Sequence, residues 1–294
     1  MADVDALSSA VYDTKQWEDF LKTKYGPYKS SKETKHFYED IKGEKTHPSV
    51  IAFLKENHEK QTYDYVRTMK EKYGKLNQGE FSIWGMLMRL DEIKVNNRGG
   101  DVQLQQKEHA FQMAESMRRE GQPRWLVMTA LIHDLGKYLY LLGEKQWTVV
   151  GEIFPVGCRF SKEIAYPHFF DNNPDTKNEK YNTKFGIYEP HCGLDKVNFS
   201  FGHDEYMYMV CNNLGYLPKE MLYILRYHSF YSCLLEGDYT YLLNDYDIEM
   251  MKWVKIFLQY DLFSFTEPLP VDLNDLKPYY VELISEYFPE KIRW

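Results

Sequence analysis

The most constraining feature of this chain is an adjacent histidine and aspartate inside an otherwise apolar helical segment. His133 and Asp134 lie in the sequence AlaLeuIleHisAspLeuGlyLys, which continues an apolar stretch that begins after Pro123. Burying an ionised carboxylate beside an imidazole costs several kcal/mol unless a cation or hydrogen bonds compensate. A metal ion would compensate, because imidazole and carboxylate are ordinary ligands for iron, manganese or zinc. The alternative is a pair satisfied by the backbone and by solvent at a helix edge.

Helical patterns dominate the sequence and predict an all-α fold. Apolar residues at helical spacing, with prolines at several first turns, predict helices from about residue 48 and over 81–90, 106–117, 123–142, 202–214, 218–231, 247–265 and 276–287. Prolines and glycines between residues 144 and 201 predict a long, ordered, irregular loop with a short hairpin near 147–157. We expect residues 1–45 to form an N-terminal arm and residues 46–294 to form one domain, because no linker-like stretch separates its halves.

Charge and composition exclude several classes of protein. Lysine and arginine together number 36 against 44 acidic residues, so the formal net charge is −8, which argues against binding to nucleic acid or to an anionic membrane. No stretch approaches the roughly 18 apolar residues of a membrane span, and the N-terminus lacks the order of a signal peptide. The cysteines show no CxxC spacing, which predicts reduced thiols in a cytoplasmic protein. The oligomeric state is not predicted, and a monomer is compatible with the sequence.

Other predicted helices offer side chains of the same kind. His109 lies in GluHisAlaPheGln, His203 opens a helix in PheGlyHisAspGluTyr, and His228 ends one in ArgTyrHisSerPheTyr. Asp261 is a lone acid on an aromatic and apolar helix. Each of these residues alone is more often part of the core or its boundary. Successive helices that each offer an inward ligand type nevertheless predict a metal site inside a helical bundle.

Two further residues receive other interpretations. Asp204 follows His203 in a second HisAsp pair, and its place at the start of a helix predicts a capping or helix-dipole role rather than ligation. His58 lies in the N-terminal part of the chain and is expected at the surface.

Several multi-residue motifs occur in an order that is similar to one known family. They are HisAspLeuGlyLys at 133–137, GlnTrpThrValValGly at 146–151, PheProValGlyCys at 154–158, ProHisCysGlyLeu at 190–194, GlyHisAspGluTyr at 202–206 and HisSerPheTyr at 228–231. With His109, His133-Asp134 and Asp261, the chain also resembles the H…HD…D signature of the HD-domain superfamily. Over about residues 50 to 265 it resembles the myo-inositol oxygenase family, which implies an all-α, HD-domain-like helical bundle.

The resemblance implies two iron ions, a mixed-valent Fe(II)/Fe(III) pair, and O2 as co-substrate. The family opens the ring of the polyol myo-inositol to give D-glucuronate. The implied ligands are His109, His133 and Asp261 for one iron, His203 and His228 for the other, and Asp134 as the bridge. These residues would leave about three surplus positive charges on the pair, which would favour a bound hydroxyl in its alkoxide form.

The resemblance also implies residues that contact the substrate. Lys137 lies one helical turn after His133, faces the same side of the predicted helix, and would act in catalysis on the bound diol. The other implied substrate contacts are Asp91, Glu92, Gly151, Glu152 and Ser229.

The surroundings of the substrate depart from the family pattern at three places. Ile93 follows Asp91-Glu92 where the family has serine, Glu152 stands where it has aspartate, and no arginine precedes Arg67. Three alternatives therefore stay open. One is the same di-iron chemistry on a different small hydroxylated substrate, another is an HD-type metal-dependent phosphohydrolase, and the third is a non-enzymatic metal-binding scaffold.

Overall fold

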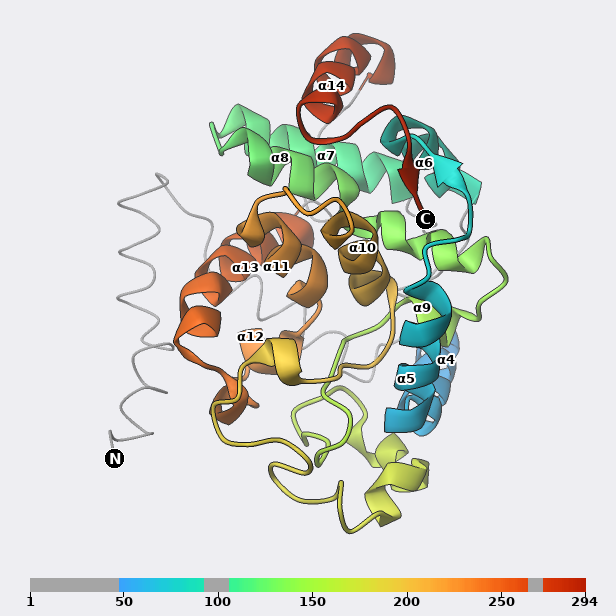
Figure 1. Ribbon diagram of the computed structural model, residues 1–294, viewed down its shortest axis with the longest axis vertical. Helices are drawn as coiled ribbons and strands as arrows, with labels where there is room; N and C mark the ends of the chain where they lie inside the picture. Colours follow the sequence, from blue (N-terminus) through green and yellow to red (C-terminus); the bar gives the residue numbers. More distant parts are fainter. Residues whose placement is uncertain (1–47, 93–105, 264–271) are drawn as a thin grey trace.

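Helices make up most of the computed structural model, which describes residues 48–92, 106–263 and 272–294 (Figure 1). Within these ranges the strands are limited to two segments of two residues each. The prediction of an all-α fold is therefore confirmed. The expected arm at residues 1–45 and the departure at Ile93 lie outside the described residues.

The predicted helices are present in the predicted order, most with bounds that differ by a few residues. The predicted helix 123–142 is an α-helix only as far as Ile132. The α-helices are α4 (Pro48–Lys60), α5 (Tyr63–Tyr73), α6 (Ile83–Arg89), α7 (Gln106–Arg119), α8 (Arg124–Ile132), α9 (Gln146–Val149), α10 (His203–Asn212), α11 (Lys219–Tyr227), α12 (Tyr231–Leu234), α13 (Asp245–Phe263) and α14 (Leu273–Tyr287). Turns of 3-10 helix are η1 (Leu90–Glu92), η2 (His133–Tyr140), η3 (Pro167–Asn172), η4 (Pro174–Lys177), η5 (Leu194–Lys196) and η6 (Thr240–Leu242).

Helices α7 and α8 form an antiparallel pair that carries much of the core. Helix α7 ends where the amide N–H of Gln122 donates to the carbonyl of Met117 at 3.0 Å, and Gly121 takes a positive φ of 73° there. This left-handed residue turns the chain directly after the helix. Pro123 then precedes α8, whose residues from Leu126 to Ile132 are all buried. An apolar segment buried on all sides is what the sequence of α8 requires.

Helices α10, α11 and α13 lie on one side of the α7–α8 pair, and α14 lies on the other (Figure 1). Contacts join α10 to η2 and to α11, and α11 to α13. The described C-terminal end is fixed by strand pairing, in which β2 (Ile292–Arg293) lies antiparallel to β1 (Glu80–Phe81). Trp294 follows β2 and is fully buried. No helix within the described ranges is both long and apolar enough to span a bilayer.

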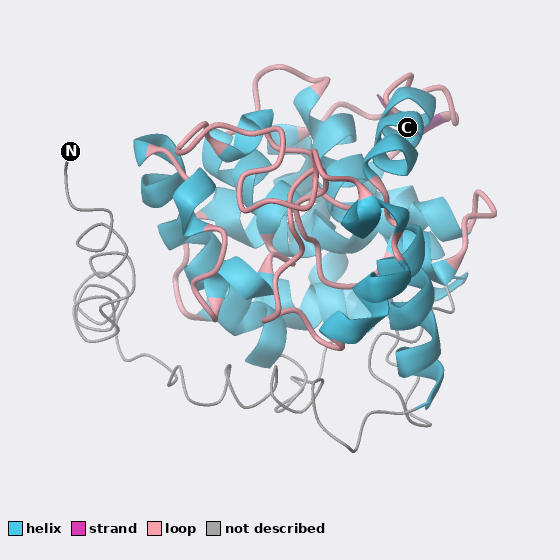
Figure 2. Cartoon of the chain, turned by 90° about the horizontal axis from the view of Figure 1, so that it is seen from below, coloured by secondary structure: helices cyan, strands magenta, loops and turns pink. Residues whose placement is uncertain are grey.

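The predicted irregular loop covers one end of the helical assembly (Figure 2). Between Val150 and Phe201 the regular structure is limited to the 3-10 turns η3, η4 and η5. The predicted hairpin at 147–157 is wrong. Its first residues form α9, and Pro155 instead forms an isolated antiparallel bridge with Phe199. Prolines and a glycine favour turns over a continuous ladder in this segment.

Two single positions matter for the packing of α4 and α5. Thr62 is the N-cap of α5, where its hydroxyl accepts from the amide of Tyr65 at 3.1 Å. His58 is buried, not exposed, with 1% of its surface accessible. Its ring stacks on Phe170 at 4.2 Å, and its Nε2 lies 2.8 Å from the carbonyl of Ala165.

Candidate metal centre

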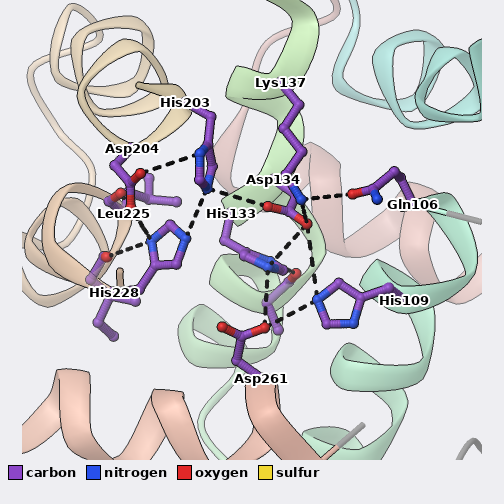
Figure 3. A network of polar contacts seen from close by, with 12 residues as sticks. Gln106, His109, His133, Asp134, Lys137, His203, Asp204, Leu225, His228 and Asp261 are labelled. Carbon is purple, nitrogen blue, oxygen red and sulfur yellow. Dashed lines mark hydrogen bonds and ion pairs between the residues drawn. The ribbon is translucent and has the colours of Figure 1, made fainter. Parts of the chain in front are cut away.

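Four imidazoles and two carboxylates meet between η2 and the helices α7, α10, α11 and α13 (Figure 3). All six side chains are buried, with accessible fractions of 7% or less. These are the six residues that the sequence singles out as metal ligands: His109, His133, Asp134, His203, His228 and Asp261. Among the described residues, groups that place three ligand atoms within 4.8 Å of one another are made of these six and Asp204.

One half of the cluster contains His109, His133 and Asp261. His109 Nε2 lies 3.1 Å and His133 Nε2 lies 3.8 Å from Oδ1 of Asp261. These atoms come from α7, the start of η2 and the C-terminal part of α13. They form a compact group of two nitrogens and one oxygen that could hold one cation.

Asp134 lies between this half and the other. Its Oδ2 is 3.5 Å from His133 Nε2 and 3.9 Å from His109 Nε2. Its other oxygen, Oδ1, is 3.5 Å from His203 Nε2. Each carboxylate oxygen therefore faces a different set of imidazoles, which is the arrangement that a bridging ligand requires.

The second half contains His203 and His228, whose Nε2 atoms lie 3.3 Å apart. Backbone carbonyls occupy the opposite edges of the rings. His203 Nδ1 lies 2.9 Å from the carbonyl of Val149, and His228 Nδ1 lies 3.2 Å from those of Ile224 and Leu225. A carbonyl only accepts, so each Nδ1 carries the proton and each Nε2 presents a lone pair.

The two facing lone pairs show whether a metal ion would fit between His203 and His228. Two neutral acceptors that face each other at 3.3 Å repel, whereas a cation between them would be attracted by both. Imidazole nitrogens about 2.1 Å from one ion stand about 3 Å apart when they subtend a right angle at it. His133 has the same tautomer, because its Nδ1 lies 2.8 Å from the carbonyl of Ala130. The donor set and its spacing therefore fit metal ions.

Burial and charge give these residues the protonation states that ligands need. Burial lowers the pKa of His133 to about 4 and also lowers the pKa of His203. Burial alone would raise the pKa of Asp134, but His133, Lys137 and His203 hold it well below the ordinary value. The pKa of Asp261 is likewise lowered, against its burial, by the hydrogen bond from His109. Neutral imidazoles and ionised carboxylates are the forms that bind metals.

The backbone around Asp134 differs from the predicted continuous helix. Helix α8 ends at Ile132, and His133–Tyr140 continues as 3-10 helix. Gly136 permits close packing here, since a Cβ at this position would lie 2.0 Å from the carbonyl oxygen of His203. Glycine thus allows η2 to approach the start of α10 and brings Asp134 to His203.

The change of helix type also repositions Lys137. In a 3-10 helix residues three apart share a face, so Lys137 lies over Asp134 and not over His133 as the sequence predicts for an α-helix. Its Nζ donates to Asp134 Oδ2 at 2.6 Å and to Gln106 Oε1 at 2.7 Å. The ammonium group is buried with these two acceptors, at the edge of the cluster (Figure 3).

The other predicted substrate contacts fall into two groups. Gly151, Glu152 and Ser229 lie together, because Ile153 N donates to Ser229 O at 3.1 Å and Ser232 N donates to Glu152 Oε1 at 2.7 Å. This group adjoins His228. Asp91 and Glu92 are exposed on η1.

The contacts of Asp91 and Glu92 are with basic side chains. Asp91 pairs with Lys107 at 2.6 Å, and Glu92 pairs with Arg89 at 3.4 Å. No contact described in the structure joins either acid to the buried cluster.

Sequence reasoning missed two neighbours of the cluster, Gln106 and Phe257, and did not place a third, Asp204, beside the histidine rings. Gln106 is buried and holds Lys137. Phe257 packs edge-on against His133 and His228 with ring centroids 5.4 and 5.9 Å away. Asp204 makes no cap hydrogen bond and instead lies 3.2 Å from the Nδ1 atoms of His203 and His228. The second HisAsp pair was the sequence signal for Asp204, whereas Gln106 and Phe257 carry no signal apart from their helical spacing.

The fold is all-α, and two joined sets of buried imidazoles and carboxylates lie inside it. These features are typical of the class of helical proteins with a two-metal centre. Comparison with known proteins narrows this class. The sequence model of the family described as myo-inositol oxygenase matches residues 47–294. The chain belongs to the myo-inositol oxygenase family.

Individual relatives agree with this assignment. The chain is 46% identical to inositol oxygenase 2 of Arabidopsis thaliana over 250 residues, which is 83% of this chain and 78% of the relative. It is 44% identical to inositol oxygenase of Danio rerio over 248 residues, 83% and 88% of the two chains. Inositol oxygenase of Mus musculus is 39% identical over 248 residues, 83% and 86%. The inositol oxygenase resemblance inferred from the motifs is therefore confirmed.

Proposed function

We propose that this protein is a di-iron oxygenase that uses O2 to open the ring of myo-inositol and gives D-glucuronate. Membership of the myo-inositol oxygenase family supports the reaction. The observation that carries the proposal is the position of Asp134, whose two oxygens face two different sets of imidazoles. A site of that kind suits two ions that share one carboxylate.

The residues would divide the work as follows. His109, His133 and Asp261 would hold one iron, His203 and His228 the other, and Asp134 both. When bound, a mixed-valent iron pair supplies Lewis acidity toward hydroxyl groups and the redox capacity to react with O2. The ligands lie on several helical segments that are packed into the core, so their positions are fixed before substrate binds.

Lys137 is the residue best placed to orient the substrate. An ammonium group carries three hydrogens, and the bonds to Asp134 and Gln106 use two of them. The third would donate to a hydroxyl oxygen of the polyol and stabilise negative charge on it. The group is buried, so water competes little for this bond and the electrostatic interaction is strong.

Gly151, Glu152 and Ser229 would form the opposite wall of the substrate site. Hydrogen bonds tie this loop to the segment that follows His228, which fixes the wall relative to the metal ligands. A wall of buried polar groups discriminates between polyols, because a missing hydroxyl leaves its partner unsatisfied. Asp91 and Glu92, which lie on η1, would contact the substrate from that side of the site.

Oxygen consumption tests the proposal directly. Iron-loaded protein should consume O2 with myo-inositol and release D-glucuronate, and turnover should stop under anaerobic conditions. A panel of other cyclic and linear polyols would then define the substrate. Hydrolysis of phosphate esters that continues without O2, or bound zinc with no redox-active metal, would contradict the proposal.

A further inference from the structure

Asp204 occupies an unusual position behind the candidate metal centre. It lies in the first turn of α10, and only 1% of its surface is accessible. Its Oδ2 is 3.2 Å from His203 Nδ1, and its Oδ1 is 3.2 Å from His228 Nδ1. Asp204 thus contacts the outer edges of both rings, while their Nε2 atoms point toward Asp134 and toward each other (Figure 3).

The carboxylate of Asp204 accepts no hydrogen bond from the described residues at either oxygen. The Nδ1 hydrogens of the two histidines are aligned with the backbone carbonyls of Val149, Ile224 and Leu225 instead. A buried carboxylate without hydrogen bonds destabilises a protein unless positive charge lies near it. Nearby imidazoles that are bound to metal ions carry such charge.

The two halves of the candidate centre differ in the number of carboxylates around them. The His109 and His133 half has Asp261 in addition to the shared Asp134. Among the described residues, the His203 and His228 half has only Asp134 at its inner face. Asp204 supplies this half with a negative charge, one imidazole ring away from the ligand nitrogens.

We infer that Asp204 is a positioning residue that His203 and His228 share, and that it tunes their half of the centre to hold its iron. Its charge makes both rings better electron donors and favours the tautomer with the proton on Nδ1. The inference rests on the proposed di-iron function. A role confined to the helix dipole, by contrast, would concern the stability of α10 alone.

The substitution Asp204→Asn keeps the size of the side chain and removes its charge. Anaerobic equilibrium dialysis against Fe(II) should show two irons bound to the parent protein. The variant should bind one iron with unchanged affinity and the second about 10- to 100-fold more weakly. Without metal, the variant should melt at the same temperature as the parent or higher, because an uncompensated buried charge has been removed.

The combination of weaker binding and undiminished metal-free stability separates this role from a structural one. Asp195→Asn removes an exposed charge from the loop before α10 and should change neither quantity. Wild-type affinity for both irons in Asp204→Asn, or a lower melting temperature of its metal-free form, would overturn the inference and leave the proposed function standing. A parent protein that binds no iron would refute the proposed function and the inference together.

Discussion

The ammonium group of Lys137 lies 2.6 Å from Oδ2 of Asp134, the carboxylate that stands between the two halves of the candidate centre. The spacing of three residues matches the repeat of the 3-10 helix that carries both. A cation therefore lies beside the proposed bridging ligand before any substrate is present. This arrangement places a donor for the polyol at one oxygen of the carboxylate that two metal ions would share.

Replacing Lys137 should separate substrate handling from metal binding. Lys137→Met should lower kcat/KM for myo-inositol about 100-fold or more, by analogy with the loss of one donor to a developing oxyanion. Iron stoichiometry should stay at the parent value. The Lys137 cation next to Asp134 opposes metal binding, so its removal does not weaken that binding. Steady-state O2 consumption and iron counting measure the two effects. Lys252→Met, at an exposed ion pair, is the control, and loss of iron from Lys137→Met would contradict this role.

Gly136 should not accept any side chain. A Cβ would overlap the carbonyl oxygen of His203, so Gly136→Ala must push η2 away from α10. We expect the free energy of unfolding to fall by about 3 kcal/mol and iron binding to weaken, because Asp134 and His203 move apart. Urea unfolding and iron dialysis measure these changes.

Gly202→Ala is the matched control for Gly136→Ala. Gly202 lies next to His203, has an extended backbone, and a Cβ there would meet its nearest atom at 3.5 Å. We expect this variant to unfold like the parent. Equal behaviour of the two alanine variants would show that packing at Gly136 does not fix the distance between η2 and α10.

A buried ion pair ties together the two helices that carry His203 and His228. Arg226 of α11 donates twice to Glu205 of α10, at 2.7 and 3.0 Å, and stacks on Tyr208 at 4.4 Å. Glu205→Leu should lower the free energy of unfolding by about 3 kcal/mol, because it leaves the buried charge of Arg226 unpaired. Arg226→Met should cost less, because Glu205 keeps its ion pair with Lys70 at 3.0 Å.

The double variant tests whether this loss comes from the pairing. Arg226→Met with Glu205→Leu should lose less than the sum of the single losses, since neither charge of the pair then remains. Urea unfolding of the four proteins measures the coupling. Losses that add without coupling would show that the two side chains act independently.

Stability should depend on pH through His58. Burial lowers its pKa from 6.5 to about 4, so between these values the unfolded chain binds a proton that the folded chain does not. The stabilisation from the neutral ring is complete above pH 6.5 and is lost as the pH falls toward 4. At pH 5 the loss from this residue should be about 2 kcal/mol.

The substitution His58→Gln isolates this contribution, because glutamine does not titrate. The difference in unfolding free energy between about pH 7.5 and pH 5 should be smaller in the variant by about 2 kcal/mol. Urea titrations at the two pH values give this double difference. Equal pH dependence of the two proteins would mean that His58 titrates normally in the fold.

The candidate ligands that the structure brings together have local signals in the sequence. His133 and Asp134 stand out because polar residues interrupt an apolar helix, and the other candidate ligands stand out as polar residues on helices. The close approach of η2 to α10 depends on the absence of a side chain at Gly136 beside His203, which is far from it in the chain. The burial of His58 depends on Ala165 and Phe170 of the long loop. Such contacts leave no periodic signal in either segment.

The candidate ligands are spread along the chain from His109 to Asp261, and no shorter fragment contains all of them. A ribosome must therefore complete Asp261 before the full set exists. Occupancy of both halves of the proposed centre would then report that the whole segment from His109 to Asp261 has been made and packed.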